Sequence, residues 1–252
     1  MKGKNMDNQH ETSVGADIAT ACRASSALGA LHWVMAAAGT DGTRPHLSGV
    51  AFARVGDALQ IVATDAYRLH AAWIACEAGV DDAYLAGAPV AGEFTVIPAA
   101  AIPRYARKDT LHGVDVGDDL VTLALESGRF TGAKLDSQYP DISRLLRDPE
   151  WGTHGMFTGV KLAGGNGYKQ AKNLPACIVY DGHGGHTLAY APIGENPIGV
   201  NPAFVADVCS QKHLTSENTI QIRTKSPFSP VLFTRTAPGI HLEALVMPVR
   251  LV

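Results

Sequence analysis

The stretch VATDAYRLH, residues 62–70, decides how the rest of the chain is interpreted. It follows a strand-like run that ends at Val62, and it joins apolar residues to the polar pair Thr64-Asp65 and the fixed cation Arg68. Two interpretations fit these residues. Either a strand ends in a turn and Arg68 lies in solvent, or the stretch forms an apolar wall with one cation at its rim. The surrounding chain has to distinguish them.

Composition limits the class of protein. A chain of 252 residues holds one large or two ordinary domains, and 46% hydrophobic with 18% charged residues is typical of a globular protein. The net charge of -3 excludes a generally basic nucleic-acid-binding protein, but not a local basic surface. The four cysteines are far apart and form no CxxC pair, which favours a reducing, cytoplasmic location and gives no zinc framework.

The N-terminal region is polar and lacks the apolar segment of a secretory signal, so residues 1–15 are expected to form a flexible tail. No apolar run approaches the roughly 18 residues that a membrane span needs. We therefore expect no membrane partner.

A weak internal repeat divides the chain. Each half is predicted to contain a strand, a helix, several strands, a second helix and three closing strands. In the first half the predicted strands are 17–23, 47–55, 58–63, 70–76, 94–97, 113–116, 120–125 and 129–135, the helices 27–38 and 98–108, the loop 77–92 and a partly helical exit 139–146. In the second half the strands are 155–160, 176–180, 186–191, 198–200, 219–224, 231–236 and 241–248, and the helices 162–173 and 203–213.

The best domain boundary is the charged, Pro- and Gly-containing segment 147–155. It predicts two related α+β domains, residues 16–148 and 149–252. The second is reduced, because its first helix is rich in glycine and one strand is missing between Tyr190 and Ile198.

The predicted helices contain more basic than acidic residues. Their windows hold one acidic residue, Asp207, against six basic ones, namely Arg104, Arg107, Lys108, Lys169, Lys172 and Lys212. If the helices share one face, that face suits a phosphate backbone without reading bases. Alternatively, Lys and Arg merely favour the last turns of helices through the helix dipole.

Five segments, in order, resemble the bacterial DNA polymerase III beta sliding clamp family. They are RPHLSGVAF at 44–52, VATDAYRL at 62–69, YPDISRLL at 139–146, VNPAFVADV at 200–208 and VMPVRL at 246–251. Together, at compatible spacings over about residues 16–252, they are specific. The resemblance implies an α+β DNA-clamp fold in which two related domains, each an antiparallel sheet with two helices, match the middle and last clamp domains.

In that family the second, third and last of these segments converge on a pocket for a short apolar peptide carried by polymerases, the clamp loader and repair proteins. The resemblance assigns to this pocket Leu47, Thr64, Ala66, Tyr67, Arg68, Leu69, Pro140, Arg144, Leu145, Asn201, Phe204, Met247, Pro248, Val249, Arg250 and Leu251. Apolar members would wall a groove, while Arg68 and Arg144 could bond peptide carbonyls or a carboxylate. Ordinary core packing and solvated arginines are the alternative.

Some features depart from the family. Its members have three domains per chain and close a ring of six from two chains, so a two-domain chain needs three copies, a head-to-tail homotrimer. Tyr67 stands where the family has histidine, Ala66 where it has glycine and Phe204 where it has tyrosine. We expect Tyr67 to be where the peptide preference differs.

No constellation in the sequence predicts catalysis, a metal or a cofactor. His183 and His186 flank two glycines typical of a turn, and the segment 164–167 lacks the Lys-Ser/Thr of a phosphate-binding loop. The leading prediction is a non-enzymatic sliding clamp that encircles double-stranded DNA and tethers a DNA polymerase. The second is an adaptor or competitor that binds clamp-binding peptides without forming a ring. An unrelated α+β enzyme is the third.

Overall fold

The structure is a computed structural model, and it describes residues 24–77, 79–103, 109–148, 156–161, 178–180, 188–190, 198–209, 219–225 and 229–249. Predicted elements and site residues beyond these ranges lie outside the described part of the chain. They include the strand 17–23 and the helix 162–173.

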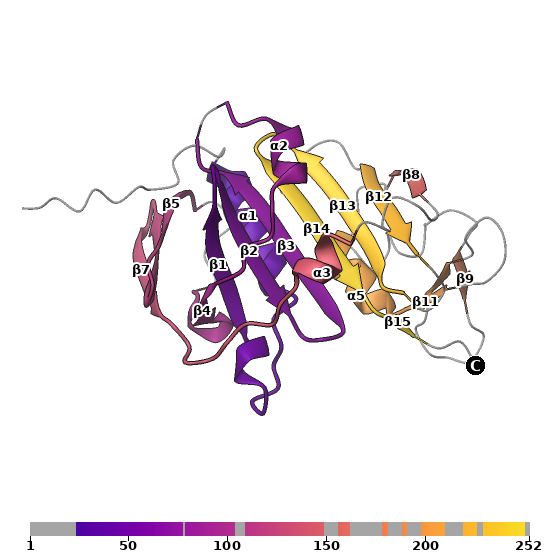
Figure 1. Ribbon diagram of the computed structural model, residues 1–252, viewed down its shortest axis with the longest axis horizontal. Coiled ribbons are helices and arrows are strands. Elements are labelled where there is room, and N and C mark those ends of the chain that lie inside the picture. Colours follow the sequence, from indigo (N-terminus) through magenta and orange to yellow (C-terminus); the bar gives the residue numbers. More distant parts are fainter. Residues whose placement is uncertain are drawn as a thin grey trace, which may run out of the picture.

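One antiparallel sheet runs through both halves of the chain (Figure 1). Its order is β4-β1-β2-β3-β14-β13-β12-β8, in which the first four strands come from the first half. The strands are β1 (Gly49–Val55), β2 (Ala58–Thr64), β3 (Arg68–Ala75), β4 (Thr95–Pro98), β8 (Met156–Lys161), β12 (Thr219–Thr224), β13 (Val231–Ala237) and β14 (Ile240–Val246). The halves meet where β3 and β14 pair over seven residue pairs, from Arg68↔Val246 to Ile74↔Ile240.

Two smaller antiparallel sheets flank this one. The first has the order β5-β6-β7 and consists of β5 (Leu111–Val116), β6 (Leu120–Leu125) and β7 (Gly128–Ala133). The second has the order β15-β11-β10-β9 and consists of β9 (Ile178–Tyr180), β10 (Leu188–Tyr190), β11 (Ile198–Val200) and β15 (Pro248–Val249). In Figure 1 they lie toward opposite ends of the long axis.

Helices cover both faces of the main sheet. On one face, α1 (Ala24–Met35) contacts β2, β3 and β14, and α5 (Pro202–Cys209) contacts β14. On the other face lie the short helices α2 (Asp82–Gly87) and α3 (Ser143–Leu146). The indole N–H of Trp33 in α1 donates to the Val208 carbonyl in α5 at 3.2 Å, so the helices from the two halves touch.

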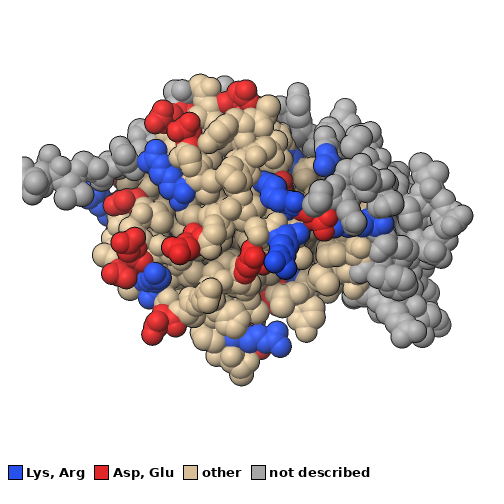
Figure 2. Space-filling model, viewed as in Figure 1, with Lys and Arg blue, Asp and Glu red and all other residues tan. Residues whose placement is uncertain are grey.

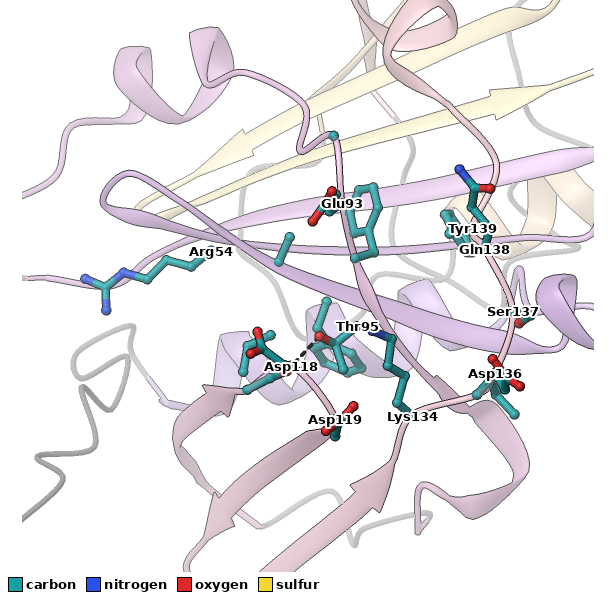
Figure 3. Close-up of a pocket in the computed structure, with 17 residues that line it drawn as sticks. Arg54, Glu93, Thr95, Asp118, Asp119, Lys134, Asp136, Ser137, Gln138 and Tyr139 are labelled. Carbon is teal, nitrogen blue, oxygen red and sulfur yellow. Dashed lines mark hydrogen bonds between the residues drawn. The ribbon is translucent and has the colours of Figure 1, made fainter.

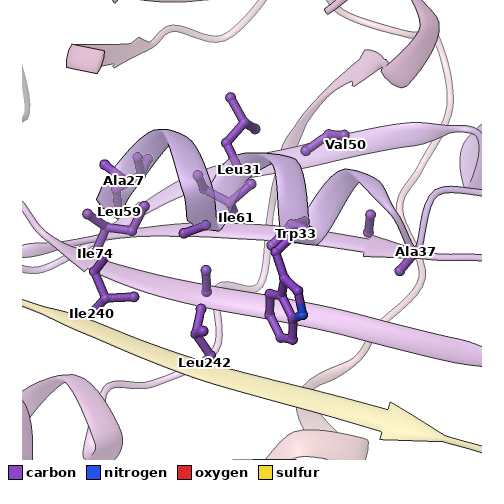
Figure 4. Close-up of a cluster of buried hydrophobic side chains, with 14 of the residues drawn as sticks. Ala27, Leu31, Trp33, Ala37, Val50, Leu59, Ile61, Ile74, Ile240 and Leu242 are labelled. Atoms are coloured by element: carbon purple, nitrogen blue, oxygen red, sulfur yellow. The ribbon is translucent and has the colours of Figure 1, made fainter. Parts of the chain in front are cut away.

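The two faces of the sheet have separate apolar cores, because successive side chains of a strand point to opposite sides. The first core contains α1 and α5 residues with Ile61, Ile74 and Leu242 (Figure 4). The second contains Val62 and Trp73 with α2 and α3 residues. Every residue of β2 is therefore buried, and the strand is apolar except for Gln60 and Thr64.

Two predicted elements were wrong. The loop predicted over 77–92 contains helix α2, and the Asp81 side chain caps it by accepting from the Tyr84 N–H at 2.8 Å. Over its described residues, 98–103, the helix predicted over 98–108 is present only as a 3-10 turn, η2 (Ala99–Ala101). Ile102 is already extended, as a residue before a proline favours. Residues 104–108 lie outside the described ranges, as does the end of the helix predicted over 203–213.

The remaining predicted strands are present within the described ranges. The strands 120–125, 198–200 and 219–224 have the predicted bounds, and the others are shifted at their ends. A 3-10 turn, η1 (Pro45–Leu47), precedes β1. Among the described residues no helix is long and apolar enough to cross a membrane. These residues also contain no group of three His, Cys, Asp or Glu side chains that could hold a metal ion. His183 and His186 lie outside them.

Candidate functional site

The turn between β2 and β3 is built by the pair Thr64-Asp65. The Thr64 hydroxyl donates to the Arg68 carbonyl at 2.7 Å and accepts from the Ala66 N–H at 3.2 Å. One Asp65 carboxylate oxygen accepts the N–H groups of Tyr67 and Arg68, each at 2.9 Å. Ala66 adopts a φ of 75°, a left-handed conformation that glycine adopts more readily. The turn is therefore rigid, and it carries local strain at Ala66.

The end of the chain's last long strand is fixed against this turn. The Met247 N–H, directly after β14, donates to the Tyr67 carbonyl at 2.8 Å. Together with the β3–β14 pairing, this bond places segments about 180 residues apart in the sequence side by side. The predicted convergence of the second and last motifs is thus present in the structure.

A cavity of about 180 Å³ lies beside the turn. Eight of the predicted pocket residues line it: Leu47, Thr64, Ala66, Arg68, Leu69, Pro140, Leu145 and Met247. Four more were not predicted: Asp141, Ile142, Pro230 and Leu245. Most of these side chains are apolar, so the cavity suits an apolar ligand group.

Exposed apolar side chains gather around this cavity. The described residues include five large hydrophobic side chains that are exposed, and three belong to this region: Tyr67 at 62%, Leu145 at 46% and Met247 at 42%. Leu145 and Met247 line the cavity, and Tyr67 is in the turn between two lining residues. Such clustering is typical of a surface that binds a partner.

The arginine of the turn, Arg68, does not lie free in solvent, which was one of the two interpretations of the sequence. The Arg68 Nε donates to the Asp65 carboxylate at 3.0 Å, and Nη1 pairs with the Asp207 carboxylate of α5. The guanidinium carbon lies 4.5 Å from the centroid of the Phe204 ring. Two carboxylates and an aromatic face therefore hold Arg68 in place and neutralise its charge.

Other predicted pocket residues take supporting positions. The Asn201 side chain caps α5 by accepting from the Ala203 N–H at 2.9 Å, and Phe204 supports Arg68. Arg144 is exposed on α3 outside the cavity lining. Pro248 and Val249 form β15, which pairs with β11, whereas Arg250 and Leu251 lie outside the described residues.

The carboxylate that lines the cavity, Asp141, forms hydrogen bonds to its neighbour in the chain, Ser143. Asp141 accepts from the Ser143 hydroxyl at 2.6 Å and from the Ser143 N–H at 2.9 Å. These bonds, the hydroxyl bond above all, lower the pKa of Asp141 below its usual range, with a smaller contribution from Arg144. Asp141 thus positions the start of α3, and with it Leu145.

A second ionic contact braces the two halves. Arg147, just after α3, donates through Nη1 to both Glu243 carboxylate oxygens at 2.9 Å, and through Nε and Nη2 to the Ala88 carbonyl at 3.1 and 2.8 Å. Its guanidinium lies 4.6 Å from the Trp73 ring, and His241 Nε2 is 3.0 Å from Glu243. No motif in the sequence signalled this pair.

The six residues predicted to face DNA, Arg104, Arg107, Lys108, Lys169, Lys172 and Lys212, all lie outside the described residues. Helices α1 and α5, which cover one face of the main sheet, contain no Lys or Arg. The basic residue of α1 is His32, and the single charged residue of α5 is Asp207. On the opposite face, shown in Figure 2, acidic and basic side chains alternate without a continuous basic patch.

A larger but polar groove, of about 1000 Å³, lies elsewhere on the first half (Figure 3). Its charged lining residues are Arg54, Glu93, Asp118, Asp119, Lys134 and Asp136. The Thr95 hydroxyl closes one side by donating to the Gly117 carbonyl at 2.7 Å. The sequence did not single out this groove, and it contains no constellation for catalysis.

Comparison with known proteins identifies relatives of this arrangement. No family model matches the chain. The curated beta sliding clamp of Synechocystis sp. is 28% identical over 250 residues, which cover 88% of this chain and 63% of that protein. The chain thus spans less than two thirds of this relative's length.

Solved structures agree with this comparison. The DNA polymerase sliding clamp of Pseudomonas aeruginosa matches with a TM-score of 0.62 at 18% identity, over 90% of this chain and 65% of that one. The sliding clamp of Caulobacter crescentus matches with a TM-score of 0.61 at 20% identity, over 90% and 64%. The likeness shows that the fold is that of sliding clamps, α+β with antiparallel sheets.

Proposed function

Because the chain is a homologue of the beta sliding clamp family, we propose that it works as a non-enzymatic processivity factor. In this role it binds clamp-binding peptides of a DNA polymerase and a clamp loader, and it encircles double-stranded DNA. The observation that carries the proposal is the apolar cavity at the Thr64–Arg68 turn, where segments from both halves of the chain meet.

The size and lining of the cavity support a peptide as its ligand. At about 180 Å³ it is smaller than the roughly 300–1,000 Å³ of pockets for cofactors and drug-sized molecules. It has room for one or two apolar side chains of an extended segment. Burying one Leu, Met or Phe side chain there would contribute about 1.5–3 kcal/mol. The neighbouring exposed Tyr67 would contact the residues that flank this anchor.

The ion pairing of Arg68 defines the peptide further. Since Asp65 and Asp207 already pair with its guanidinium, a carboxylate on the peptide would have to displace one of them. The described part of the pocket therefore selects apolar side chains more than acidic ones. Among the described residues of the predicted site, Arg144, exposed on α3, is the cation that a peptide carboxylate would reach first.

The assembly that we propose is a ring of six domains. In this proposal residues 16–148 and 149–252 correspond to two related clamp domains, and three copies supply six. The six basic residues of the predicted helices would face the duplex and contact phosphates without reading the sequence.

Peptide titration tests the pocket. A fluorescent peptide carrying adjacent Leu and Phe side chains should bind the full chain, and Met247→Ala should weaken it about tenfold, because this truncation removes apolar contact area. Leu120→Ala is the matched control, since Leu120 is equally exposed but belongs to β6 outside the pocket. Equal affinities for the Met247 variant and the unchanged protein would remove the pocket assignment.

One observation favours a second candidate, an adaptor that binds the same peptides without encircling DNA. Helices α1 and α5, on the side that would face the duplex, contribute no Lys or Arg in the described residues. Retention on DNA separates the candidates. A ring loaded on closed circular DNA stays bound and is lost after linearisation, whereas an adaptor shows no such difference.

A further inference from the structure

Two charged side chains are among the described residues that line the apolar cavity, and they differ in what they can offer a ligand. They are Arg68 and Asp141. The Arg68 guanidinium is already paired with the carboxylates of Asp65 and Asp207. A ligand therefore competes with two anions for Arg68, and Asp141 is the charge of the lining that a ligand can reach without such competition.

One of the two carboxylate oxygens of Asp141 is uncommitted. The Ser143 hydroxyl and N–H both donate to Oδ1, at 2.6 and 2.9 Å, whereas Oδ2 accepts no hydrogen bond from another described residue. The bonds from Ser143 hold the pKa of Asp141 below its usual range, so the carboxylate is charged at neutral pH. They also fix its orientation. A charged and oriented oxygen thus borders an apolar cavity.

The charges at this site favour a positive ligand group over a negative one. Among the described residues that line the cavity, pair with its lining or belong to the predicted pocket, three carboxylates stand against two guanidinium groups. They are Asp65, Asp141 and Asp207 against Arg68 and Arg144. Arg144 is exposed outside the lining. The local field is therefore negative on balance, and it attracts a cation.

Apolar surface lies directly beside the Asp141 carboxylate. Its neighbours in the chain, Pro140 and Ile142, also line the cavity, and so does Leu145 of α3, which is 46% exposed. A Lys or Arg side chain can lay its methylene stem along such a surface while its charged end reaches a carboxylate. Successive residues of an extended peptide are about 3.3–3.6 Å apart, so a residue next to the buried anchor is close enough to do this.

We propose that Asp141 forms a subsite for a basic side chain, so that the pocket selects peptides in which Lys or Arg adjoins the apolar anchor. Asp141 is thereby a specificity-determining residue, in addition to its part in positioning the start of α3. The inference rests on the proposed peptide-binding function, and it names the chemistry of the peptide. A docking segment with an acidic residue at this place is disfavoured.

Matched fluorescent peptides test this subsite on the full chain. Each carries adjacent Leu and Phe side chains, and the residue beside this pair is Lys, Gln or Glu. The variable residue precedes the pair in one set and follows it in another, and the set in which it reaches Asp141 should bind in the order Lys, Gln, Glu. The Lys peptide should bind about two- to fivefold more tightly than the Gln peptide, as expected for an exposed ion pair. This ratio should fall toward one as the salt concentration rises.

A conservative substitution identifies the carboxylate. Asp141→Asn removes the charge but keeps an oxygen for the bonds from Ser143, and the ratio of Lys to Gln peptide affinities should fall to about one. Both peptides are measured on the same variant, so a general loss of affinity cancels in the ratio. Asp118→Asn is the matched control, because Asp118 is an exposed carboxylate that lines the polar groove, and it should leave the ratio unchanged. If Asp141→Asn does not fold, the order of the three peptides on the unchanged protein decides.

Two results would overturn the inference: equal affinities for the three peptides in both sets, or a preference for Lys that persists in Asp141→Asn. In both cases the Leu-Phe peptides still bind, so the pocket assignment stands without the basic subsite. If every peptide failed to bind the unchanged protein, the pocket itself would be overturned, and the subsite with it.

Discussion

The two hollows of the molecule differ in size and in chemistry, and the smaller one is the better candidate site. The groove of about 1000 Å³ is lined only by first-half residues, and charged side chains are among them. The cavity of about 180 Å³ is apolar, and both halves contribute to it. Convergence of distant segments, and not volume, distinguishes the two.

The physical reason lies in what a ligand displaces. Water in a polar groove is held by charges, so a ligand must replace those hydrogen bonds to gain affinity. Water over Leu69, Leu145 and Met247 has few polar partners, and its release favours binding. Only the cavity therefore offers binding energy without a specific polar match.

The largest expected effect is on peptide binding, and it tests directly whether the cavity or the groove is the site. Leu145→Asp places a carboxylate beside Asp141 at the cavity and should weaken peptide binding about a hundredfold, through lost apolar burial and repulsion of the incoming side chain. Asp118→Lys, a charge change within the groove, should leave the affinity unchanged. If peptide titration gave the opposite pattern, the groove would be the site.

Low pH should destabilise the fold near the cavity, because a buried histidine there resists protonation. His70, next to Leu69 on β3, donates from Nδ1 to the Trp33 carbonyl at 2.8 Å and stacks on the Trp33 ring at 4.3 Å. Burial lowers the pKa of His70 to about 4. The unfolded chain takes up this proton near pH 6.5, so the folded state loses stability as the pH falls from about 6.5 to 4, by about 3 kcal/mol in total.

Denaturant titration between pH 7 and 4 measures this loss. His70→Gln keeps a donor for the Trp33 carbonyl but cannot be protonated, so most of the pH dependence in this window should disappear. An unchanged slope in the variant would assign the acid sensitivity to other groups.

The groove has its own buried titratable group, and we expect it to be structural. Burial raises the pKa of Tyr139, and its hydroxyl has no hydrogen-bond partner among the described residues. Tyr139→Phe should therefore increase the free energy of unfolding by about 1 kcal/mol, since an unpaired buried hydroxyl is removed. A destabilised variant would show that this hydroxyl forms a hydrogen bond in the groove, and would favour the groove as a binding site.

The smallest effect concerns the strain at the turn. Ala66→Gly should stabilise the protein by about 0.5–1 kcal/mol, because glycine adopts the φ of 75° at lower cost. Ala83→Gly in α2 is the control, and should destabilise by about 1 kcal/mol as expected within a helix. Thermal unfolding of both variants checks the sign, and a destabilised Ala66→Gly would contradict the strained conformation.

The sequence predicted most strands because their apolar patterns are local. It missed α2 because the Gly- and Ala-rich composition of 77–92 outweighed the capping signal of Asp81. It predicted a helix directly after Pro98, where the structure has a 3-10 turn, because a residue that precedes a proline favours an extended backbone and Ile102 adopts one before Pro103.

The sequence motifs predicted many of the pocket residues. They could not predict contacts between residues that are far apart in the sequence. Ile142 and Leu245 could have been found, since they lie within or beside motif segments. The pairing of Arg68 with Asp207 could not be predicted, because Asp207 is 139 residues away and only the fold brings it near. Pro230 lies in no motif, and no local pattern marks it.

The ladder between β3 and β14 also has a mechanical consequence. Bending the molecule at this place would require opening seven residue pairs at once, and would break the brace between Arg147 and Glu243. The two halves therefore move together as one rigid body. A force applied at one end is therefore transmitted to the other. In the ring that we propose, a gate for DNA would open between chains and not within one.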